Sequence, residues 1–284
     1  MNQETVFGKY AFRAMTYLVC LFFAVLSIFP FYLMVINGTR NTHEIATNPI
    51  SVLPSVYLKD NMRILLAGGK SFDPVVGFRN SMIISASSTL CAIYFSALTA
   101  YGLVAYRWRL RKPFFTFVLA VMMIPSQVMV IGYFQFIYSI GMTNNFLPLI
   151  IPAIASPAMV FFMRQYLLAT LHLDIINSAR IDGSGEFYTF NRIVLPIMKP
   201  ALATQAIFAF VASWNNLFLP MVLLTNSKNY TMPIMVGLLK GDIYRTEYGS
   251  IYLGLTMTVL PLFVVYFILS RYIIAGVALG GVKE

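Results

Sequence analysis

Residues 113–163 read PFFTFVLAVMMIPSQVMVIGYFQFIYSIGMTNNFLPLIIPAIASPAMVFFM and contain no Asp, Glu, Lys, Arg or His. These 51 residues are more than twice the roughly 20 apolar residues that an α-helix needs to cross a bilayer. A cluster of turn-forming residues, Gly141 to Asn145, divides the stretch. The stretch therefore predicts two membrane-spanning helices, at about 114–139 and 146–169.

Four other stretches, 14–39, 80–106, 200–227 and 248–270, also contain no Asp, Glu, Lys, Arg or His. Only 11% of the 284 residues are charged, against roughly 25% in soluble domains, so composition excludes a soluble globular protein. A β-barrel is disfavoured because its strands alternate apolar and polar residues. We expect an all-α integral membrane protein with six transmembrane helices, forming one transmembrane domain over 1–284. The remaining four spans are expected at about 15–36, 80–105, 201–225 and 248–270.

The distribution of Lys and Arg predicts how the chain is oriented in the membrane. The first apolar run is too long for the core of a signal peptide, so we expect it to be a retained span. If the N-terminus lies inside, the inner connections carry 12 Lys and Arg residues and the outer ones 8. The inner set includes the compact cluster Arg107, Arg109, Arg111 and Lys112, which has no acidic neighbour. Because cytoplasmic loops carry the excess of positive charge, both termini are expected in the cytoplasm.

The connection between the fourth and fifth spans carries the most information about function. Residues 174–196 read DIINSARIDGSGEFYTFNRIVLP. Apolar residues at helical spacing predict a short amphipathic helix over 173–182, and Gly183 and Gly185 predict a break after it. Phe187, Phe190 and Val194 predict a second helix, ended by Leu195-Pro196 just before the fifth span. On spacing alone, a pair of interfacial helices lying among lipid headgroups is an equal alternative.

This segment resembles the signature loop of permease subunits in binding-protein-dependent ABC importers. The resemblance rests on Ala179–Gly183 (ARIDG), typical of the carbohydrate branch, and on Ile193–Pro196 (IVLP). It extends over essentially the whole chain and is similar to the second membrane subunit of maltose-type importers. The further segments that carry it are Glu44–Leu53, Phe78–Ser81 and Ser213–Asn216.

The resemblance implies that residues 173–196 form a cytoplasmic coupling helix that seats in a groove of an ATPase subunit. Ile176 and Ala179 are expected to pack in that groove, and Gly183 to form the corner of the loop. Asn177 and Ser178 replace the usual Glu and Ala. Asn can hydrogen-bond but carries no charge, so the contact expected with an arginine of the ATPase is weaker here. The full set of expected coupling residues is Ile176, Asn177, Ser178, Ala179, Arg180, Asp182 and Gly183.

The family also implies the partners: a second permease subunit in a heterodimer, two cytoplasmic ATPase subunits, an extracytoplasmic solute-binding protein and membrane lipid. No nucleic acid is expected. The chain is not expected to be an enzyme, because Gly69-Lys70-Ser71 ends like a phosphate-binding loop but Ile64 stands where that motif needs glycine. We expect no cofactor or metal on this chain, with ATP and Mg²⁺ used by the ATPase. The expected location is the bacterial cytoplasmic (inner) membrane.

Amide side chains within the expected spans are candidates for the translocation pathway. Such groups face the interior of a helix bundle, where they either contact a sugar or form structural hydrogen bonds between helices. The second role is favoured, because Asn215 and Asn216 belong to a segment that recurs in the family. The candidates are Gln127, Gln135, Gln205, Asn215 and Asn216.

A secondary, ion-coupled carrier is the alternative function. Carriers driven by protons usually hold an ionisable residue near the middle of the membrane. The five apolar stretches contain no Asp, Glu, Lys, Arg or His. This favours a transporter whose energy is supplied at a cytoplasmic loop.

Overall fold

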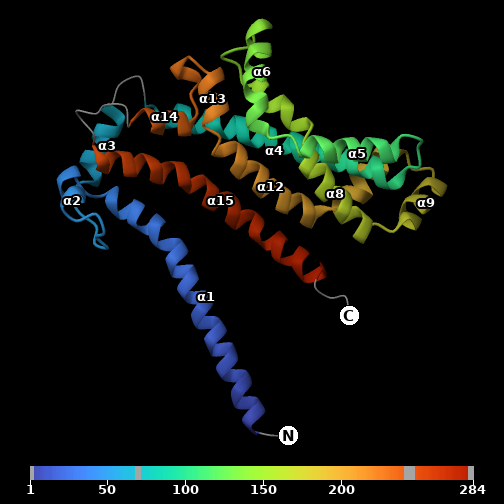
Figure 1. Ribbon diagram of the computed structural model, residues 1–284, viewed down its shortest axis with the longest axis horizontal. Helices are drawn as coiled ribbons and strands as arrows, with labels where there is room; N and C mark the ends of the chain where they lie inside the picture. The colour runs from blue at the N-terminus through green and yellow to red at the C-terminus, as the bar shows by residue number, and fades with distance from the viewer. Residues whose placement is uncertain (1–2, 68–71, 240–246, 281–284) are drawn as a thin grey trace. The chain divides into compact units, whose positions relative to one another are not determined.

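The computed structural model describes residues 3–67, 72–239 and 247–280, and every regular element within these ranges is helical (Figure 1). The all-α prediction is thereby confirmed for the described residues. Contacts divide the chain into two compact units, one formed by 1–72 and 236–259, the other by 73–235 and 260–284. The helices are α1 Gln3–Asn37, α2 Thr42–Thr47, α3 Leu58–Ala67, α4 Pro74–Ala105, α5 Arg111–Met122, α6 Ser126–Ser139, α7 Leu147–Ile150, η2 Ile151–Ile154, α8 Pro157–Thr170, α9 Leu173–Ile181, α10 Glu186–Thr189, η3 Phe190–Val194, α11 Leu195–Ile197, α12 Lys199–Trp214, α13 Phe218–Leu223, η4 Ser227–Asn229, α14 Met232–Leu238 and α15 Tyr248–Gly280.

The first unit is held together by a polar turn that follows α1. Arg40 is only 5% exposed, and its guanidinium donates to the side-chain oxygen of Asn37 and to the carbonyls of Glu44 and Asn48. The buried amide of Asn61 donates to the carbonyls of Gly38 and Arg40. A buried charge is tolerated when its hydrogen bonds are satisfied, and here backbone carbonyls satisfy most of them. The part of the family-like segment around Glu44 thus has a structural role.

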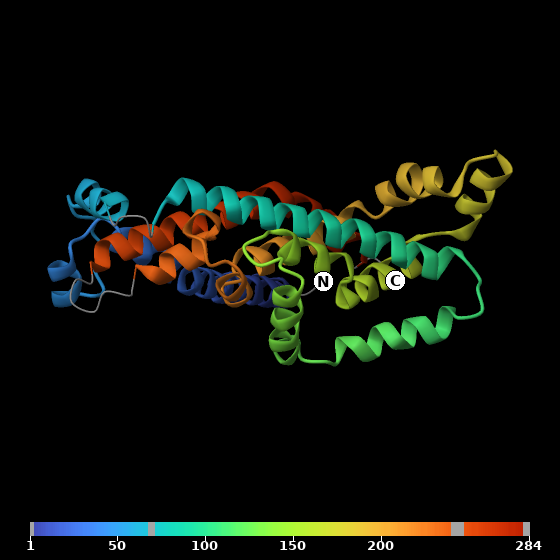
Figure 2. The same cartoon turned by 90° about the horizontal axis from the view of Figure 1, so that it is seen from above.

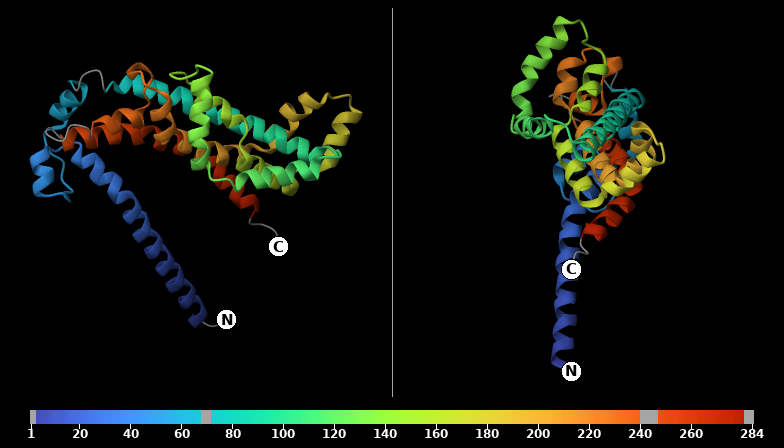
Figure 3. Two further views of the ribbon diagram at one scale, coloured as in Figure 1. Left: turned by 45° about the horizontal axis from the view of Figure 1, so that its top comes forward. Right: turned by 90° about the vertical axis from the view of Figure 1, so that its right-hand side faces the viewer.

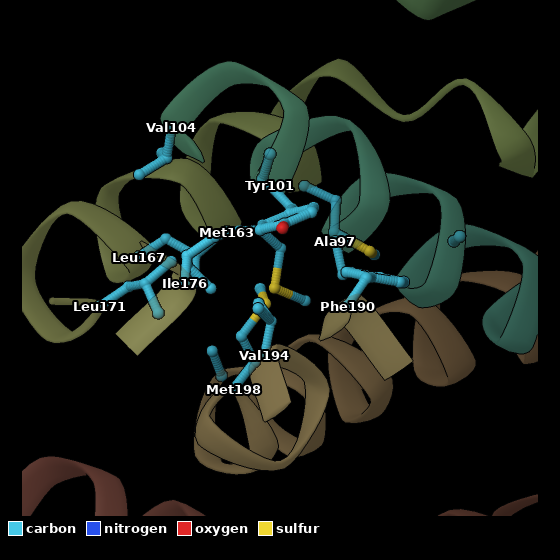
Figure 4. Close-up of a cluster of buried hydrophobic side chains, with 14 residues drawn as sticks. Ala97, Tyr101, Val104, Met163, Leu167, Leu171, Ile176, Phe190, Val194 and Met198 are labelled. Carbon is cyan, nitrogen blue, oxygen red and sulfur yellow. The ribbon is translucent and has the colours of Figure 1, made fainter. Parts of the chain in front are cut away.

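The core of the second unit forms around α4, which packs mainly against α8 and α12 (Figure 2). The contact face of α4 is rich in small residues, among them Ser85, Ser96, Ala97 and Ala100, which are all fully buried. Small side chains let neighbouring helices approach closely, which is the usual packing of helices in membranes. Towards its C-terminal end α4 meets larger side chains from α8, α9, η3 and α12 in one apolar cluster (Figure 4).

Within the described residues, four helical segments are long and apolar enough to span a membrane: Phe12–Asn37, Pro74–Ala105, Leu147–Thr170 and Tyr248–Ile268. They match the expected first, second, fourth and sixth spans. The expected third span, 114–139, is instead divided into α5 and α6, and α6 turns away from α5 (Figure 1). Pro125 stands between them; it lacks a backbone N–H and its ring opposes a continuous helix.

The expected fifth span, 201–225, is also interrupted. α12 ends at Trp214, and α13 begins only at Phe218. α12 and the helical segment Glu186–Ile197 before it form a pair bent by 80°, which together are apolar enough for a broken span. The prediction of continuous helices at 114–139 and 201–225 is therefore wrong, although both regions are helical for most of their length.

At the N-terminal end of α4, the family-like segment Phe78–Ser81 is hydrogen-bonded to residues 228–232 and makes a ring contact with the family-like segment Ser213–Asn216. The buried amide of Asn80 donates to the carbonyls of Lys228 and Tyr230, and the hydroxyl of Ser81 accepts from the backbone N–H of Met232. The ring of Phe78 meets that of Trp214 edge-on, with centroids 5.7 Å apart. These residues therefore fix the second unit at this end.

Candidate functional site

The loop between α8 and α12 forms an L-shaped corner at the C-terminal end of α4 (Figure 3). α9 covers Leu173–Ile181, close to the predicted 173–182. Its end is closed by two backbone hydrogen bonds, from Ser184 N–H to the carbonyl of Ala179 and from Gly183 N–H to that of Arg180. This pattern is a Schellman motif, which places the residue after the cap in the left-handed region. Gly183 has φ +78°, so the predicted corner lies at this glycine.

The inner face of α9 is covered by the chain's own core. Ile176 is 1% exposed and Ala179 6%. Ile176 lies in the apolar cluster with Tyr101 of α4 and Leu167 of α8 (Figure 4). The expectation that Ile176 and Ala179 themselves pack in a partner's groove is therefore corrected. Periodicity identified the apolar face, but the body that covers this face is the same chain.

The outer face of α9 and the corner is open to solvent and carries large apolar side chains. Ile181 is 86% exposed, and Phe187 and Tyr188 of α10 are 68% and 61% exposed. Asn177 and Ser178 are exposed as well. Asn177 also lines a hollow of about 350 Å³ between α9 and the end of α4, together with Arg107 and Arg180. A partner can reach these side chains without disturbing the core.

Glu186 fastens the corner to α4. Arg180 Nε donates to Glu186 Oε1 across the corner at 2.6 Å. The hydroxyls of Tyr101 and Tyr106 both donate to Glu186 Oε2, at 3.0 and 2.5 Å. The guanidinium of Arg180 also lies over the ring of Tyr106, 5.3 Å from its centroid. One carboxylate thus joins α9, α10 and the end of α4, and we call these four residues the Glu186 cluster.

The electrostatics of the Glu186 cluster follow from these bonds. The hydrogen bond from Arg180 holds the pKa of Glu186 below its ordinary value. The same bond raises the pKa of Arg180. Burial, followed by the bond to Glu186, raises the pKa of the Tyr106 hydroxyl. The carboxylate therefore stays ionised and both tyrosines stay neutral donors at neutral pH.

The second helical arm of the corner contains a π-helical turn, η3, between α10 and α11. Phe190 and Val194 on this turn are fully buried against α4. Pro196 was expected to end the arm, but α11 continues through it to Ile197 and the bend falls at Met198. Local π-helical adjustment is a common way for a helix to accommodate proline.

The candidates for the translocation pathway are not brought together. Gln135 on α6 and Asn215 after α12 are exposed, and Gln205 on α12 is half-buried. The side chain of Gln127 lies outside the described residues. Asn216 lines an open, mainly apolar cavity of about 470 Å³ with Tyr133 and Phe218.

Asn216 also supports its own chain. Its side-chain oxygen accepts from the N–H of Leu219, at 3.4 Å, at the start of α13. This bond is local to the start of α13 and joins no second helix, so a structural bond between helices stays a prediction for Asn216.

The fold is that of an all-α chain with several helices long and apolar enough to span a membrane, and its corner exposes large apolar side chains. The chain belongs to the family described as binding-protein-dependent transport system inner membrane component, whose model matches residues 92–278. It is thus a permease component of a transport system in the inner membrane, and this settles the choice against an ion-coupled carrier.

Two relatives and one solved structure agree with this assignment. The arabinooligosaccharides transport system permease protein AraQ of Bacillus subtilis is 32% identical, over 93% of this chain and 94% of that protein. The lactose transport system permease protein LacG of Rhizobium radiobacter is 30% identical, over 92% of each. A chain in the crystal structure of a bacterial ABC transporter involved in the import of the acidic polysaccharide alginate superposes with a TM-score of 0.76. That match has 19% identity and covers 93% of this chain and 97% of the other. This last likeness concerns the fold.

Proposed function

We propose that the chain forms half of the translocation pathway of an ABC importer for a sugar or oligosaccharide. The family assignment and the names of the relatives support the transport class and the carbohydrate cargo. The observation that carries the mechanism is the corner at Gly183. Its inner face is fastened to α4 and α8, and its outer face exposes apolar side chains. A partner that moves the outer face therefore moves the helices of the core.

In this proposal the outer face of residues 173–188 seats on a cytoplasmic ATPase subunit. Ile181, Phe187 and Tyr188 supply the apolar contact, since they are the most exposed large apolar side chains of the corner. Asn177 and Ser178 supply uncharged polar contacts in place of the usual Glu and Ala. Arg180, Asp182 and Gly183 set the shape of the corner, and Ile176 and Ala179 anchor it from within.

The proposed topology is a single transmembrane domain with six crossings and both termini in the cytoplasm. α5 with α6 would supply the third crossing and α12 with α13 the fifth, each as a broken helix. The excess of Lys and Arg on the side of the corner supports this orientation. The partners are a second permease subunit, two ATPase subunits and an extracytoplasmic solute-binding protein. ATP and Mg²⁺ are used by the ATPase, and this chain binds no cofactor.

The substitution Gly183→Val tests the coupling role. A Cβ at Gly183 has no atom within 4 Å, so the cost is conformational: a β-branched residue strongly disfavours φ +78°. We expect the variant to insert normally but to lose uptake, while the assembled importer hydrolyses ATP independently of substrate. Uptake and ATPase activity in reconstituted vesicles measure the two effects.

Gly185→Val is the matched control. Gly185 also has open space around it, but its φ of −67° is one that any residue adopts. This variant should keep most of its uptake. If Gly183→Val transports as well as Gly185→Val, the corner does not couple ATP hydrolysis to transport.

A further inference from the structure

The connection between α4 and α5 carries an unusual concentration of positive charge. Arg107, Arg109, Arg111 and Lys112 follow one another within six residues, and we call them the basic rim. The sequence has no Asp or Glu between Asp73 and Asp174. Among the residues that the structure describes, the ion pairs are Arg63–Asp60 and Arg180–Glu186, so none involves the basic rim. Within the described ranges, no carboxylate therefore pairs with these cations.

The basic rim lies where positive charge is least favourable. Arg111 and Lys112 occupy the first turn of α5, and α5 has no side-chain cap at its N-terminus. The N-terminal end of a helix carries a partial positive charge, so cations there are destabilising and an anion is stabilising. Arg111 and Lys112 therefore destabilise the start of α5 unless an anion from outside the chain binds there.

A fifth cation, Arg164 of α8, lies beside the basic rim. Its guanidinium carbon is 4.0 Å from the centroid of the Phe115 ring, and the charge of Arg111 acts on it. Its Nε is buried and has no hydrogen-bond acceptor within the described part of the chain. Arg111 and Arg164 are both half-buried. Two like charges partly removed from water, one with an unused donor, indicate a missing anionic partner.

Two hollows meet at the basic rim and differ in character. One, of about 580 Å³, is lined by the four cations together with Trp108 and Pro113. The other, of about 410 Å³, is largely apolar and includes Leu103 and Phe114. Both are lined by Arg107 and Trp108, so they adjoin. A ligand that fills both has an anionic part and an apolar part.

We propose that the α4–α5 connection binds an anionic phospholipid, with the phosphate headgroup on the basic rim and the acyl region over Trp108 and Phe114. The exposed apolar residues Leu110 and Phe117 extend the apolar side. Basic pockets between membrane helices on the cytoplasmic side are suited to such headgroups. The hollow between α9 and the end of α4 is also lined by Arg107. A bound lipid would thus lie next to the corner. This inference goes beyond the proposed function, because it concerns the lipid and none of the transport partners.

The chain contains its own probe for this site. It has two tryptophans; Trp108 is 41% exposed at the site and Trp214 is 1% exposed in the core. The full chain is reconstituted in phosphatidylcholine vesicles that contain a variable fraction of brominated phosphatidylglycerol or brominated phosphatidylcholine, and tryptophan quenching is measured. We expect the phosphatidylglycerol to associate at least about fivefold more strongly, because each cation near an anionic lipid contributes about 1 kcal/mol. Raising the salt concentration to about 1 M should remove most of this preference.

The double variant Arg109→Gln/Lys112→Gln removes two exposed charges with little risk to folding. It should reduce the preference for phosphatidylglycerol over phosphatidylcholine to near unity. Arg111→Gln/Arg164→Gln should do the same, with the blue-shifted emission of Trp214 reporting that the core is intact. The control, Arg192→Gln/Lys199→Gln, removes two exposed charges outside both hollows and should keep the preference.

The proposal is wrong if the two brominated lipids quench equally in the unmodified chain, or if both rim variants keep the preference. Competition by inorganic phosphate at matched ionic strength would mean that the site takes free phosphate, which also overturns the lipid assignment. Loss of ATPase copurification in the rim variants, without any lipid preference in the parent, would make the rim a protein contact and overturn it too.

Discussion

The two ends of α4 are fastened by different chemistry. At the N-terminal end, uncharged amides and a hydroxyl bond to backbone groups, as with Asn80 and Ser81. Asn144 does the same in a nearby turn, where its side chain and backbone form hydrogen bonds with residues 223–229. At the C-terminal end, the half-exposed carboxylate of Glu186 accepts hydrogen bonds from one arginine and two tyrosines.

This difference separates a fixed end from an adjustable one. Bonds between neutral groups do not titrate and are little affected by salt. A half-exposed ion pair is weak, screened by salt and sensitive to its neighbours. The end that faces the proposed ATPase is therefore the end whose attachment can be broken and re-formed at low cost.

A large effect on stability is expected from Asn144→Ala. Asn144 has φ +57°, and its side chain makes hydrogen bonds to Thr225 and Asn226. Loss of these bonds and the unfavourable backbone conformation together should cost about 3 kcal/mol. Thermal unfolding in detergent measures it. Asn144→Gly keeps the backbone conformation and should cost less, and Asn145→Ala, which removes one bond to the N–H of Leu147, should cost least.

Ile176→Ala and Ile181→Ala should separate the two faces of α9. Ile176 is fully buried, so its truncation should destabilise the chain by about 2–4 kcal/mol. Ile181 is almost fully exposed, so its truncation should leave the unfolding temperature unchanged and weaken copurification with the ATPase subunit. The opposite result, a stable Ile176→Ala chain that loses the ATPase, would restore Ile176 as a contact residue.

Glu186→Gln keeps the shape of the side chain but removes the charge that Arg180 contacts. Because the pair is partly exposed, we expect a loss of about 1 kcal/mol, which should loosen the corner and reduce uptake about fivefold at unchanged membrane insertion. Asp174→Asn removes a charge from the first turn of the same α9 and is the control. Equal uptake by the two variants would show that the Glu186 cluster does not hold the corner for transport.

The smallest effect is the pH dependence of the corner. The folded-state pKa of Glu186 is depressed, so its contribution is complete above the ordinary carboxyl pKa and is lost as pH falls through the depressed value. Hydrogen exchange of α9 and α10 should therefore be protected equally at neutral and mildly acidic pH and lose protection only in stronger acid. The turn at Asn144 should show no such step, and loss of protection in both regions at the same pH would point to global unfolding.

The parts of this site that local sequence could predict are those set by local forces. Glycine at 183 indicates a left-handed corner, and the spacing of Leu173, Ile176 and Ala179 indicates a helix with one apolar face. The partners of Glu186 could not be predicted, because Tyr101 and Tyr106 are more than 75 residues away in the sequence. What covers the apolar face of α9 could not be predicted for the same reason. Periodicity identifies the face but does not say whether the same chain or a partner packs against it.

The broken helices show a different limit. Hydropathy alone predicts a continuous span over 114–139, yet Pro125 within it was a readable signal for a break. The end of α12 at Trp214 had no comparable signal, because Asn215 and Asn216 are tolerated in helices. A contact from another helix favours that boundary: Trp214 is buried, and its ring meets that of Phe78 of α4. The side chain of Asn216 then accepts from the N–H of Leu219 in the next helix.

The bend at Met198 lets the segment before it act as a lever on α12. The arm Glu186–Ile197 has 12 residues, so it is about 18 Å long, and it meets α12 at 80°. For a rigid arm pivoting at Met198, a push of about 2 Å at its tip becomes a rotation of about 6°, turning α12 about its own long axis rather than sliding it. Met198 is completely buried, which keeps the pivot in place. In this way a small displacement at the tip of the arm is converted into a rotation of α12.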